Sequence, residues 1–273
     1  MRVAICQLNS RDDKEQNLAT AENLVREAAA DRADLIALPE YTDYQGPKEG
    51  ALASAEPDDG PTTRRFSALA AELGVNILLG SIRIQTDDAE RCNNRSFLFD
   101  RGGKISAQYN KLHLYDVDLP GRITYRESDT VVPGDGVVMG EVDGHKAGLS
   151  ICYDVRFPEL FRLQALNGAE ILFVPAAFAL YTGRDHWEVL LRARAIENQC
   201  FVIAPGQFGP YPPAGACNGR SIIIDPWGNV LARMADCVGY AVADLDFSMQ
   251  TKTREELPSL GNRRADMYDL KIA

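Results

Sequence analysis

Short apolar runs closed by glycine, proline or a charged residue recur along the chain. Runs of this length, rich in β-branched residues, are typical of buried strands, which we predict at 2–7, 34–38, 76–81, 170–175 and 201–204. Between them, apolar residues return at helical spacing. The first such stripe consists of Leu18, Ala21, Leu24, Val25 and Ala28, and the second of Phe66, Leu69, Ala70 and Leu73. These stripes predict two amphipathic helices.

The second half of the chain continues the alternation. Segments 96–105 and 137–146 resemble hairpins, the latter with an Asp-Gly turn. Helices are predicted at about 158–167 and 185–198, and a last strand at 220–224. We expect the sheet content to end there, at a turn over 225–228. Hairpins mixed with crossovers predict an α/β protein whose mixed sheets are covered by helices.

Composition is ordinary for a globular protein. The chain has 273 residues, of which 45% are hydrophobic and 25% charged, enough for one large core, although length alone also allows two domains. The net charge is −10 and the lysines and arginines are dispersed, which argues against a nucleic-acid surface. Small molecules are therefore the expected partners.

The termini and cysteines predict a cytoplasmic protein without a membrane anchor. No apolar run reaches the length needed to cross a bilayer, and Met1 leads into a predicted strand instead of a signal peptide. The six cysteines are far apart and form no C-x-x-C pair, as expected of reduced thiols. Cys6 and Cys200 lie in apolar runs and are expected to be packing residues.

Three chemically useful side chains come at strand ends. The apolar run that starts at Gly148 ends at Cys152, Glu40 follows Pro39 after another strand, and Lys111 ends the strand that begins near Ile105. A thiol, a carboxylate and an ammonium group could supply a nucleophile, a general base and an oxyanion stabiliser if these ends converge. Spacing alone does not establish convergence, and a buried structural cysteine is the alternative.

The segments around these three residues resemble the nitrilase superfamily of carbon–nitrogen hydrolases. They read Leu-Pro-Glu40, Asn-Lys111-Leu-His-Leu and Ile-Cys152-Tyr-Asp-Val-Arg-Phe-Pro-Glu-Leu, and the resemblance runs from Met1 to about Tyr268. Segments 120–130 and 182–199 are similar to the branch that holds omega-amidase and deaminated-glutathione amidase. The resemblance implies a four-layer α-β-β-α sandwich with mixed sheets, a single domain over 1–273, and a homodimer or higher homo-oligomer.

The resemblance also implies roles for four residues. Cys152 would attack an amide carbon and form a thioester, Glu40 would act as general base, and Lys111 would stabilise the oxyanion, with its charge favouring the Cys152 thiolate. Glu127 falls at the position of the family's second glutamate, the alternative being a solvated loop carboxylate. No metal or cofactor is needed for this chemistry.

A wider set of residues is expected to line or support the substrate pocket. Arg156 could hold a substrate carboxylate or pair with Glu159, and Arg184 is either a second candidate for that carboxylate or merely solvated. Tyr41 and His113 are expected to support the site without reacting. The full predicted substrate-binding set is Tyr41, His113, Tyr153, Arg156, Phe178, Tyr181 and Thr182.

The favoured function is hydrolysis of a small carboxylate-bearing amide to a carboxylate and ammonia. An N-carbamoyl-amino-acid hydrolase and a broad aliphatic amidase are the alternatives within the family, and a true nitrilase is less favoured. A Cys-His hydrolase of another fold has only His113, His145 and His186 to draw on, none in a distinctive context. A non-catalytic binding protein would not need the intact Glu40, Lys111 and Cys152 set.

Overall fold

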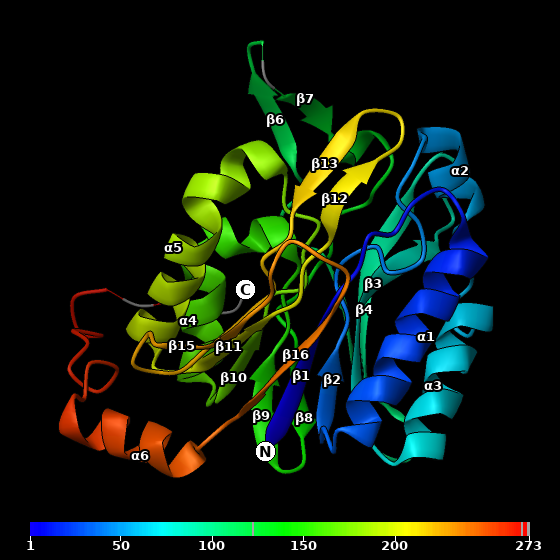
Figure 1. Ribbon diagram of the computed structural model, residues 1–273. Coiled ribbons are helices and arrows are strands. Elements are labelled where there is room, and N and C mark those ends of the chain that lie inside the picture. The colour runs from blue at the N-terminus through cyan, green and yellow to red at the C-terminus, as the bar shows by residue number, and fades with distance from the viewer. Residues whose placement is uncertain (122, 269, 272–273) are drawn as a thin grey trace.

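Two mixed six-stranded sheets face each other between two layers of helices in the computed structural model, which describes residues 1–121, 123–268 and 270–271 (Figure 1). The first sheet has the order β16 (Gly239–Asp244), β1 (Arg2–Gln7), β2 (Leu35–Ala37), β3 (Asn76–Gln85), β4 (Cys92–Phe99) and β5 (Ile105–Asn110). The second has the order β15 (Val230–Arg233), β14 (Ile222–Ile224), β11 (Phe201–Ala204), β10 (Ile171–Phe173), β9 (His145–Gly148) and β8 (Met139–Val142). The predicted α-β-β-α sandwich with mixed sheets is confirmed.

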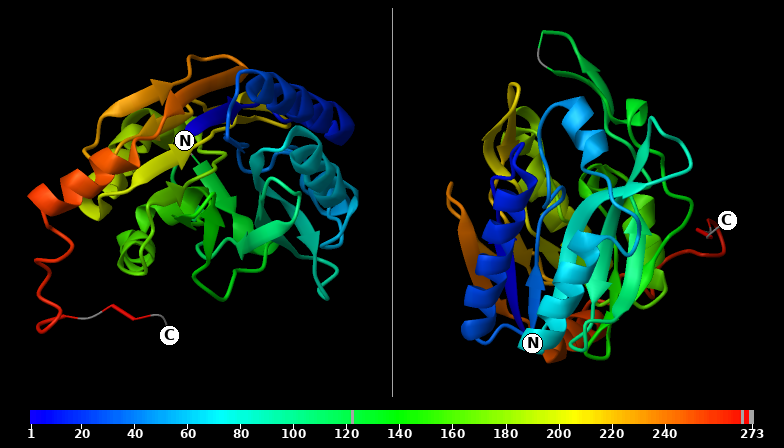
Figure 2. Two further views of the ribbon diagram at one scale, coloured as in Figure 1. Left: turned by 90° about the horizontal axis from the view of Figure 1, so that it is seen from below. Right: turned by 90° about the vertical axis from the view of Figure 1, so that its right-hand side faces the viewer.

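Helices cover the outer face of each sheet. On the first sheet lie α1 (Lys14–Ala30) and α3 (Pro61–Leu73), and on the second α4 (Pro158–Leu166) and α5 (Leu180–Asn198) (Figure 1). Two helices lie outside these layers, the short α2 (Lys48–Ala53) and α6 (Phe247–Glu256). Helix α6 lies to one side of the sandwich, together with segment 257–268 (Figure 2). None of the helices in the described ranges is long and apolar enough to cross a membrane.

The period of two along the strands creates two separate apolar cores. In β1, Val3 and Ile5 face the second sheet, whereas Ala4 and Cys6 face the helices of the first layer. The same alternation continues in β2, where Ile36 packs on the helix side. Side chains on successive strand positions point to opposite faces, so an entirely apolar strand is buried on both sides.

Local sequence signals fix the ends of the covering helices. The Asp13 carboxylate accepts a hydrogen bond from the Gln16 backbone N–H and caps the start of α1. Pro61 occupies the first turn of α3, and Gly74 ends that helix in the left-handed conformation with φ 66°. Both predicted apolar stripes face the core, and Leu73 packs against it while only half buried.

Several predicted boundaries are wrong. The sheet content does not end at 225–228, because β15 and β16 follow and β16 pairs antiparallel with β1 along its whole length. β16 is an edge strand with half-buried residues, so its apolar pattern is weak. Helix α5 begins at Leu180 instead of 185, and β9 ends at Gly148, four residues before Cys152.

Two small hairpins were also missed. They are formed by β6 (Asp116–Leu119) with β7 (Ile123–Arg126) and by β12 (Phe208–Tyr211) with β13 (Gly215–Asn218). Both stand at the same end of the sandwich, at the top of Figure 1. The predicted Asp-Gly turn does join β8 to β9, with positive φ at both Asp143 and Gly144.

A break in the β3–β4 ladder supports the loop after β2. The register shifts between Leu79 and Ile82, so the backbone around Ser81 is free to pair with the loop. Ser81 accepts the Tyr41 N–H at its side chain and the Thr42 N–H at its carbonyl, both at 3.0 Å. Gly80 comes so close that an added Cβ would lie 2.0 Å from the Leu38 carbonyl oxygen. Only glycine fits there without moving the backbone that leads to Glu40.

We predict that Gly80→Ala lowers the free energy of unfolding by at least about 1–3 kcal/mol, because the new methyl group overpacks against backbone atoms that cannot rotate away. Urea denaturation is the measurement. Gly136→Ala is the matched control, since a Cβ at Gly136 meets no atom within 4 Å. Equal midpoints for the two variants would contradict the role given to this close approach.

Candidate active site

The C-terminal ends of β2, β5 and β9 meet at one end of the sandwich. β5 runs parallel to β2 and β3, because two antiparallel pairings separate it from β3. An isolated parallel bridge between Leu8 and Gln207, which follow β1 and β11, joins corresponding ends of the two sheets. Residues that directly follow these strands therefore come together across the sheets, as the carboxyl ends of parallel strands do.

Lys111, the residue after β5, is buried at the centre of this convergence. Its side chain is 2% exposed, and its ammonium group donates to Glu40 Oε1 at 2.9 Å and to Glu127 Oε2 at 2.8 Å. Burial opposes the charge, but the two carboxylates outweigh it and raise the pKa of Lys111 well above its usual value. Lys111 is therefore a fixed cation at neutral pH.

Glu40 is held from both sheets. Its Oε1 accepts hydrogen bonds from Lys111 and from Asn94 Nδ2, each at 2.9 Å. Its Oε2 accepts the backbone N–H of Ala177 at 2.7 Å. Asn94 belongs to β4 of the first sheet, whereas Ala177 follows β10 of the second. The carboxylate of Glu40 is thereby fixed in a site closed to bulk solvent.

Glu127 lies in a single turn of 3₁₀ helix after β7 and is 1% exposed, so the alternative of a solvated loop carboxylate is wrong. Besides Lys111, it accepts the Tyr41 hydroxyl and the Tyr115 backbone N–H, both at 2.7 Å. Burial alone would raise the pKa of Glu127, but the Lys111 charge and these hydrogen bonds lower it. Glu127 is therefore ionised beside Lys111.

Cys152 opens a 3₁₀ turn over Cys152–Arg156 and has the left-handed φ of 50°. This conformation is costly for a residue with a Cβ and produces a sharp elbow. The backbone N–H of Cys152 donates to the Pro175 carbonyl at 2.9 Å. Cys152 is 8% exposed, and its thiol is close enough to Glu40 and Lys111 for their charges to act on it.

The Lys111 charge favours the Cys152 thiolate, as expected, but it does not outweigh the effects that oppose ionisation. Burial, followed by the charge of Glu40, raises the pKa of Cys152 well above its usual value, and the opposing effect of Lys111 is smaller. The sulfur is therefore protonated at neutral pH. A protonated thiol attacks a carbon centre only if a base accepts its proton, and Glu40 is a nearby carboxylate.

Arg156 stands at the other end of the same 3₁₀ turn among aromatic rings. Its guanidinium carbon lies 5.7 Å from the ring centroid of Tyr153 and 5.3 Å from that of Phe178. Its Nη1 is 3.2 Å from Nδ1 of His186. Within the described residues, the Arg156 guanidinium contacts these rings and His186, and the ion pair with Glu159 that the sequence allowed does not form.

The other predicted pocket residues are dispersed. Tyr41 contacts Glu127, while His113 bonds to Asp154 and stacks on Phe157. Tyr181 is half exposed on the first turn of α5, and the adjacent Thr182 hydroxyl donates to the carbonyl of Ala179, the residue before the helix. The structure brings Tyr41 to the buried carboxylates and leaves Tyr181 toward solvent.

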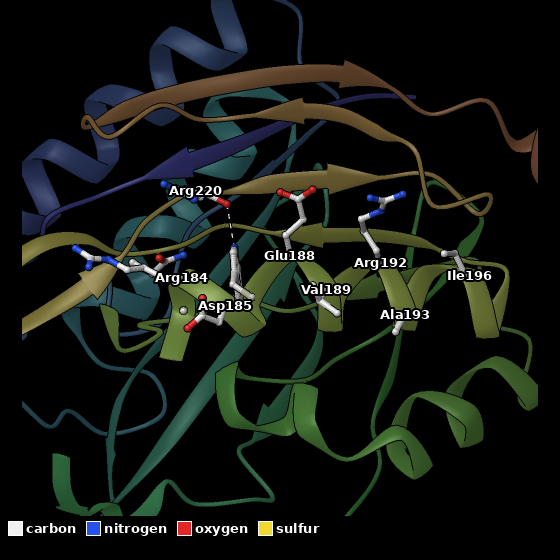
Figure 3. A pocket seen from close by; sticks show the side chains of 11 residues that line it. Arg184, Asp185, Glu188, Val189, Arg192, Ala193, Ile196 and Arg220 are labelled. Carbon is white, nitrogen blue, oxygen red and sulfur yellow. Dashed lines mark hydrogen bonds between the residues drawn. The ribbon is translucent and has the colours of Figure 1, made fainter. Parts of the chain in front are cut away.

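Arg184 lies in a different place. It lines a surface groove of about 490 Å³ along the outer face of α5, with Glu188, Arg192 and Arg220 (Figure 3). None of the residues that line this groove is Glu40, Lys111, Glu127 or Cys152. Of the two arginines considered for a substrate carboxylate, only Arg156 shares the turn of Cys152.

Sequence reasoning missed Asn94 and the Ala177 N–H. Asn94 is fully buried in β4 and donates to Glu40 and, at 3.2 Å, to Glu127. A polar residue on the buried face of a strand was the available signal, since it must find partners inside. A backbone donor such as Ala177 leaves no mark in the sequence. Within the described ranges, no cluster of three histidine, cysteine or acidic side chains is arranged to hold a metal ion.

Comparison with known proteins gives consistent matches over nearly the whole length. The family model described as carbon–nitrogen hydrolase matches residues 2–255. Deaminated glutathione amidase of Mus musculus is 42% identical over 97% of this chain and 84% of its own, and omega-amidase of Mus musculus is 36% identical over 99% and 97%. The crystal structure of the Caenorhabditis elegans NitFhit protein superposes with a TM-score of 0.92 at 36% identity, covering 98% of this chain and 66% of that one.

We predict that the thiolate absorbance of Cys152 is absent in the free protein at neutral pH. Its raised pKa keeps the sulfur protonated until the solution pH exceeds that value, so the ultraviolet difference spectrum between wild type and Cys152→Ala should stay flat from about pH 6 to about pH 8.5. A thiolate band titrating within this range would show that Lys111 outweighs burial.

Proposed function

The chain belongs to the carbon–nitrogen hydrolase family, and from this we propose that it is an amidohydrolase that cleaves a small carboxylate-bearing amide to a carboxylate and ammonia through a thioester on Cys152. The observation that carries the proposal is the buried Lys111 between Glu40 and Glu127, with the Cys152 thiol beside them. As a member of this family, the protein is an enzyme that acts on a non-peptide C–N bond.

In the first step, the Cys152 sulfur attacks the amide carbon while Glu40 accepts the thiol proton. The carbonyl oxygen becomes an oxyanion, which the Lys111 ammonium and the Tyr153 backbone N–H stabilise. Glu40 then gives its proton to the nitrogen, the C–N bond breaks and ammonia leaves. The acyl group remains on Cys152 as a thioester.

In the second step, Glu40 removes a proton from water, which attacks the thioester carbon. The C–S bond breaks, the proton returns to the Cys152 sulfur, and the acid is released. Glu40 needs a fixed position for both steps, and its bonds to Asn94 and the Ala177 N–H support this requirement.

Glu127 is proposed to hold Lys111 in place. Both of its carboxylate oxygens contact the ammonium group, with Nζ–Oε distances of 2.8 and 3.0 Å. Because Tyr41 and the Tyr115 N–H also bind this carboxylate, its orientation is fixed from the first sheet and from the β6 side. A carboxylate constrained in this way positions the cation that the oxyanion needs.

Arg156 is the proposed partner of the substrate carboxylate. It lies four residues after Cys152, and the rings of Tyr153 and Phe178 flank it. An arginine in partly dry aromatic surroundings binds a carboxylate through charge-assisted hydrogen bonds. One relative is named for deaminated glutathione, a molecule that carries carboxylates. The alternatives are an N-carbamoyl-amino-acid hydrolase and a broad aliphatic amidase.

We predict that Cys152→Ala abolishes ammonia release from every substrate while leaving the melting temperature close to that of wild type, because the nucleophile is lost with little volume. The screen covers α-ketoglutaramate, α-ketosuccinamate, deaminated glutathione, N-carbamoyl amino acids and aliphatic nitriles. Intact-protein mass spectrometry of wild type with its best substrate should find an acyl adduct on Cys152.

Cys6→Ala is the matched control, since Cys6 is also buried but lies in β1 among core side chains. It should retain turnover and the adduct. Activity in Cys152→Ala, or an adduct on another cysteine, would refute the mechanism. Strong turnover of N-carbamoyl amino acids alone would replace the amide with the carbamoyl alternative.

We predict that Arg156→Met lowers kcat/KM for carboxylate-bearing amides by about tenfold to a hundredfold, since a charge-assisted hydrogen bond contributes about 1.5–3 kcal/mol. Neutral amides of the same length should be unaffected. Arg184→Met is the matched control, because that arginine lines the separate groove on α5. An unchanged ratio between acidic and neutral amides in Arg156→Met would favour a broad aliphatic amidase.

A further inference from the structure

Asp154 is a buried carboxylate with four hydrogen-bonding groups around it. It lies two residues after Cys152 and is 0% exposed. Its Oδ2 accepts the Ile151 N–H at 2.8 Å and the Tyr109 hydroxyl at 2.7 Å. Its Oδ1 contacts the His113 N–H at 3.0 Å and His113 Nδ1 at 2.7 Å. The reaction steps proposed above make no use of this residue.

The donors come from the two segments that present Lys111 and Cys152. Tyr109 and His113 flank Lys111 by two residues on either side, and Ile151 directly precedes Cys152. The Tyr109 hydroxyl also accepts the Leu112 N–H at 3.1 Å, which closes the backbone turn around Lys111. Asp154 therefore joins the end of β5 in one sheet to the elbow after β9 in the other.

His113 extends this connection to the far end of the Cys152 turn. Its ring stacks on Phe157 with centroids 3.7 Å apart and planes 7° apart. Phe157 also lies edge-on to Tyr153, at 5.5 Å between ring centroids. The 3₁₀ turn is thus held by Asp154 within it and by the His113 ring at its C-terminal end. This position makes His113 a support of the turn.

A carboxylate is the side chain that these donors require. Both oxygens of Asp154 face N–H or O–H groups, and a carboxylate accepts hydrogen bonds at each oxygen. An asparagine amide accepts at only one end, so its NH₂ group would face donors on one side or the other. A buried donor left without an acceptor is costly, and the two segments would separate to relieve the contact.

We propose that Asp154 is a positioning residue that sets the distance between the Lys111 ammonium group and the carbon centre bound to Cys152. The inference rests on the proposed acyl transfer. Misplacement of a catalytic group by about 1 Å can cost about a hundredfold in rate, so the connection through Asp154 affects turnover more than substrate binding.

The test is a double-mutant cycle of Asp154→Asn with Lys111→Met, read out as the single-turnover rate of Cys152 acylation by intact-protein mass spectrometry. Asp154→Asn alone should lower kcat by about tenfold to a hundredfold with little change in KM. If Asp154 acts through Lys111, the same substitution should cost almost nothing further in the Lys111→Met background. Additive losses would overturn the proposal.

Asp225→Asn is the matched control for a buried aspartate that organises a turn. Asp225 is 4% exposed and accepts the backbone N–H groups of Trp227 and Asn229, away from Lys111 and Cys152. It should reduce stability without lowering kcat. If Asp154→Asn does not fold, Tyr109→Phe removes one of the hydrogen bonds to Asp154 and should lower kcat by a smaller factor with KM unchanged. An unchanged kcat would count against the proposal.

A readout without turnover separates this inference from the proposed function. Crystal structures of wild type and Asp154→Asn give the distance from Lys111 Nζ to Cys152 Sγ in each. The proposal requires this distance to differ between the two proteins, and an equal distance in both would overturn it. An inactive wild type that forms no acyl adduct would instead refute the proposed function, while the comparison of distances still decides the role of Asp154.

Discussion

The burial of one ammonium group between two carboxylates is the interaction on which this end of the structure depends. Lys111, Glu40 and Glu127 carry a combined charge of −1 in a place closed to water, and such charges are stable only if every polar atom finds a partner. Asn94, Tyr41 and two backbone N–H groups supply the remaining donors. Removing one member of a buried ionic cluster costs about 3–5 kcal/mol, so the surrounding backbone is constrained to keep the cluster complete.

The cluster also makes the packing of the two sheets a condition for the site. Glu40 comes from the first sheet and Cys152 from the second, where the cysteine is part of the main apolar core. Gln207, after β11, donates to the carbonyls of Glu40 and Tyr41 at 3.0 and 3.1 Å and so fixes one sheet against the other. A shift between the sheets would separate the Cys152 thiol from Glu40, its proposed base, because neither sheet contains both residues.

Burial away from water leaves some groups of the site charged and others neutral. Lys111 and Glu127 stay ionised because each has an opposite charge in contact, whereas burial and the charge of Glu40 outweigh Lys111 at Cys152 and keep its thiol protonated. In the proposed mechanism, the Cys152 thiol therefore keeps its proton until a substrate is present, and only then transfers it to Glu40. The proposed carboxylate-bearing substrate would approach two carboxyl groups, which is consistent with the proposal that a separate cation, Arg156, binds it.

The sequence by itself determined the architecture and the chemical candidates. Alternation in strands such as β1 and the stripe of α1 follow from local periodicity, and Glu40, Lys111, Glu127 and Cys152 stand in short segments that resemble one family. Their roles, the single domain and the homo-oligomer stay predictions. Only the tertiary structure decided which groups meet. Residues far apart in the chain are joined where β16 pairs with β1, where Asn94 and the Ala177 N–H donate to Glu40, and where Asp154 makes its four contacts. It also decided that Cys152 is a thiol and that Arg184 lies on another face, because burial and distance between charges are properties of the packed chain and not of the order of its residues.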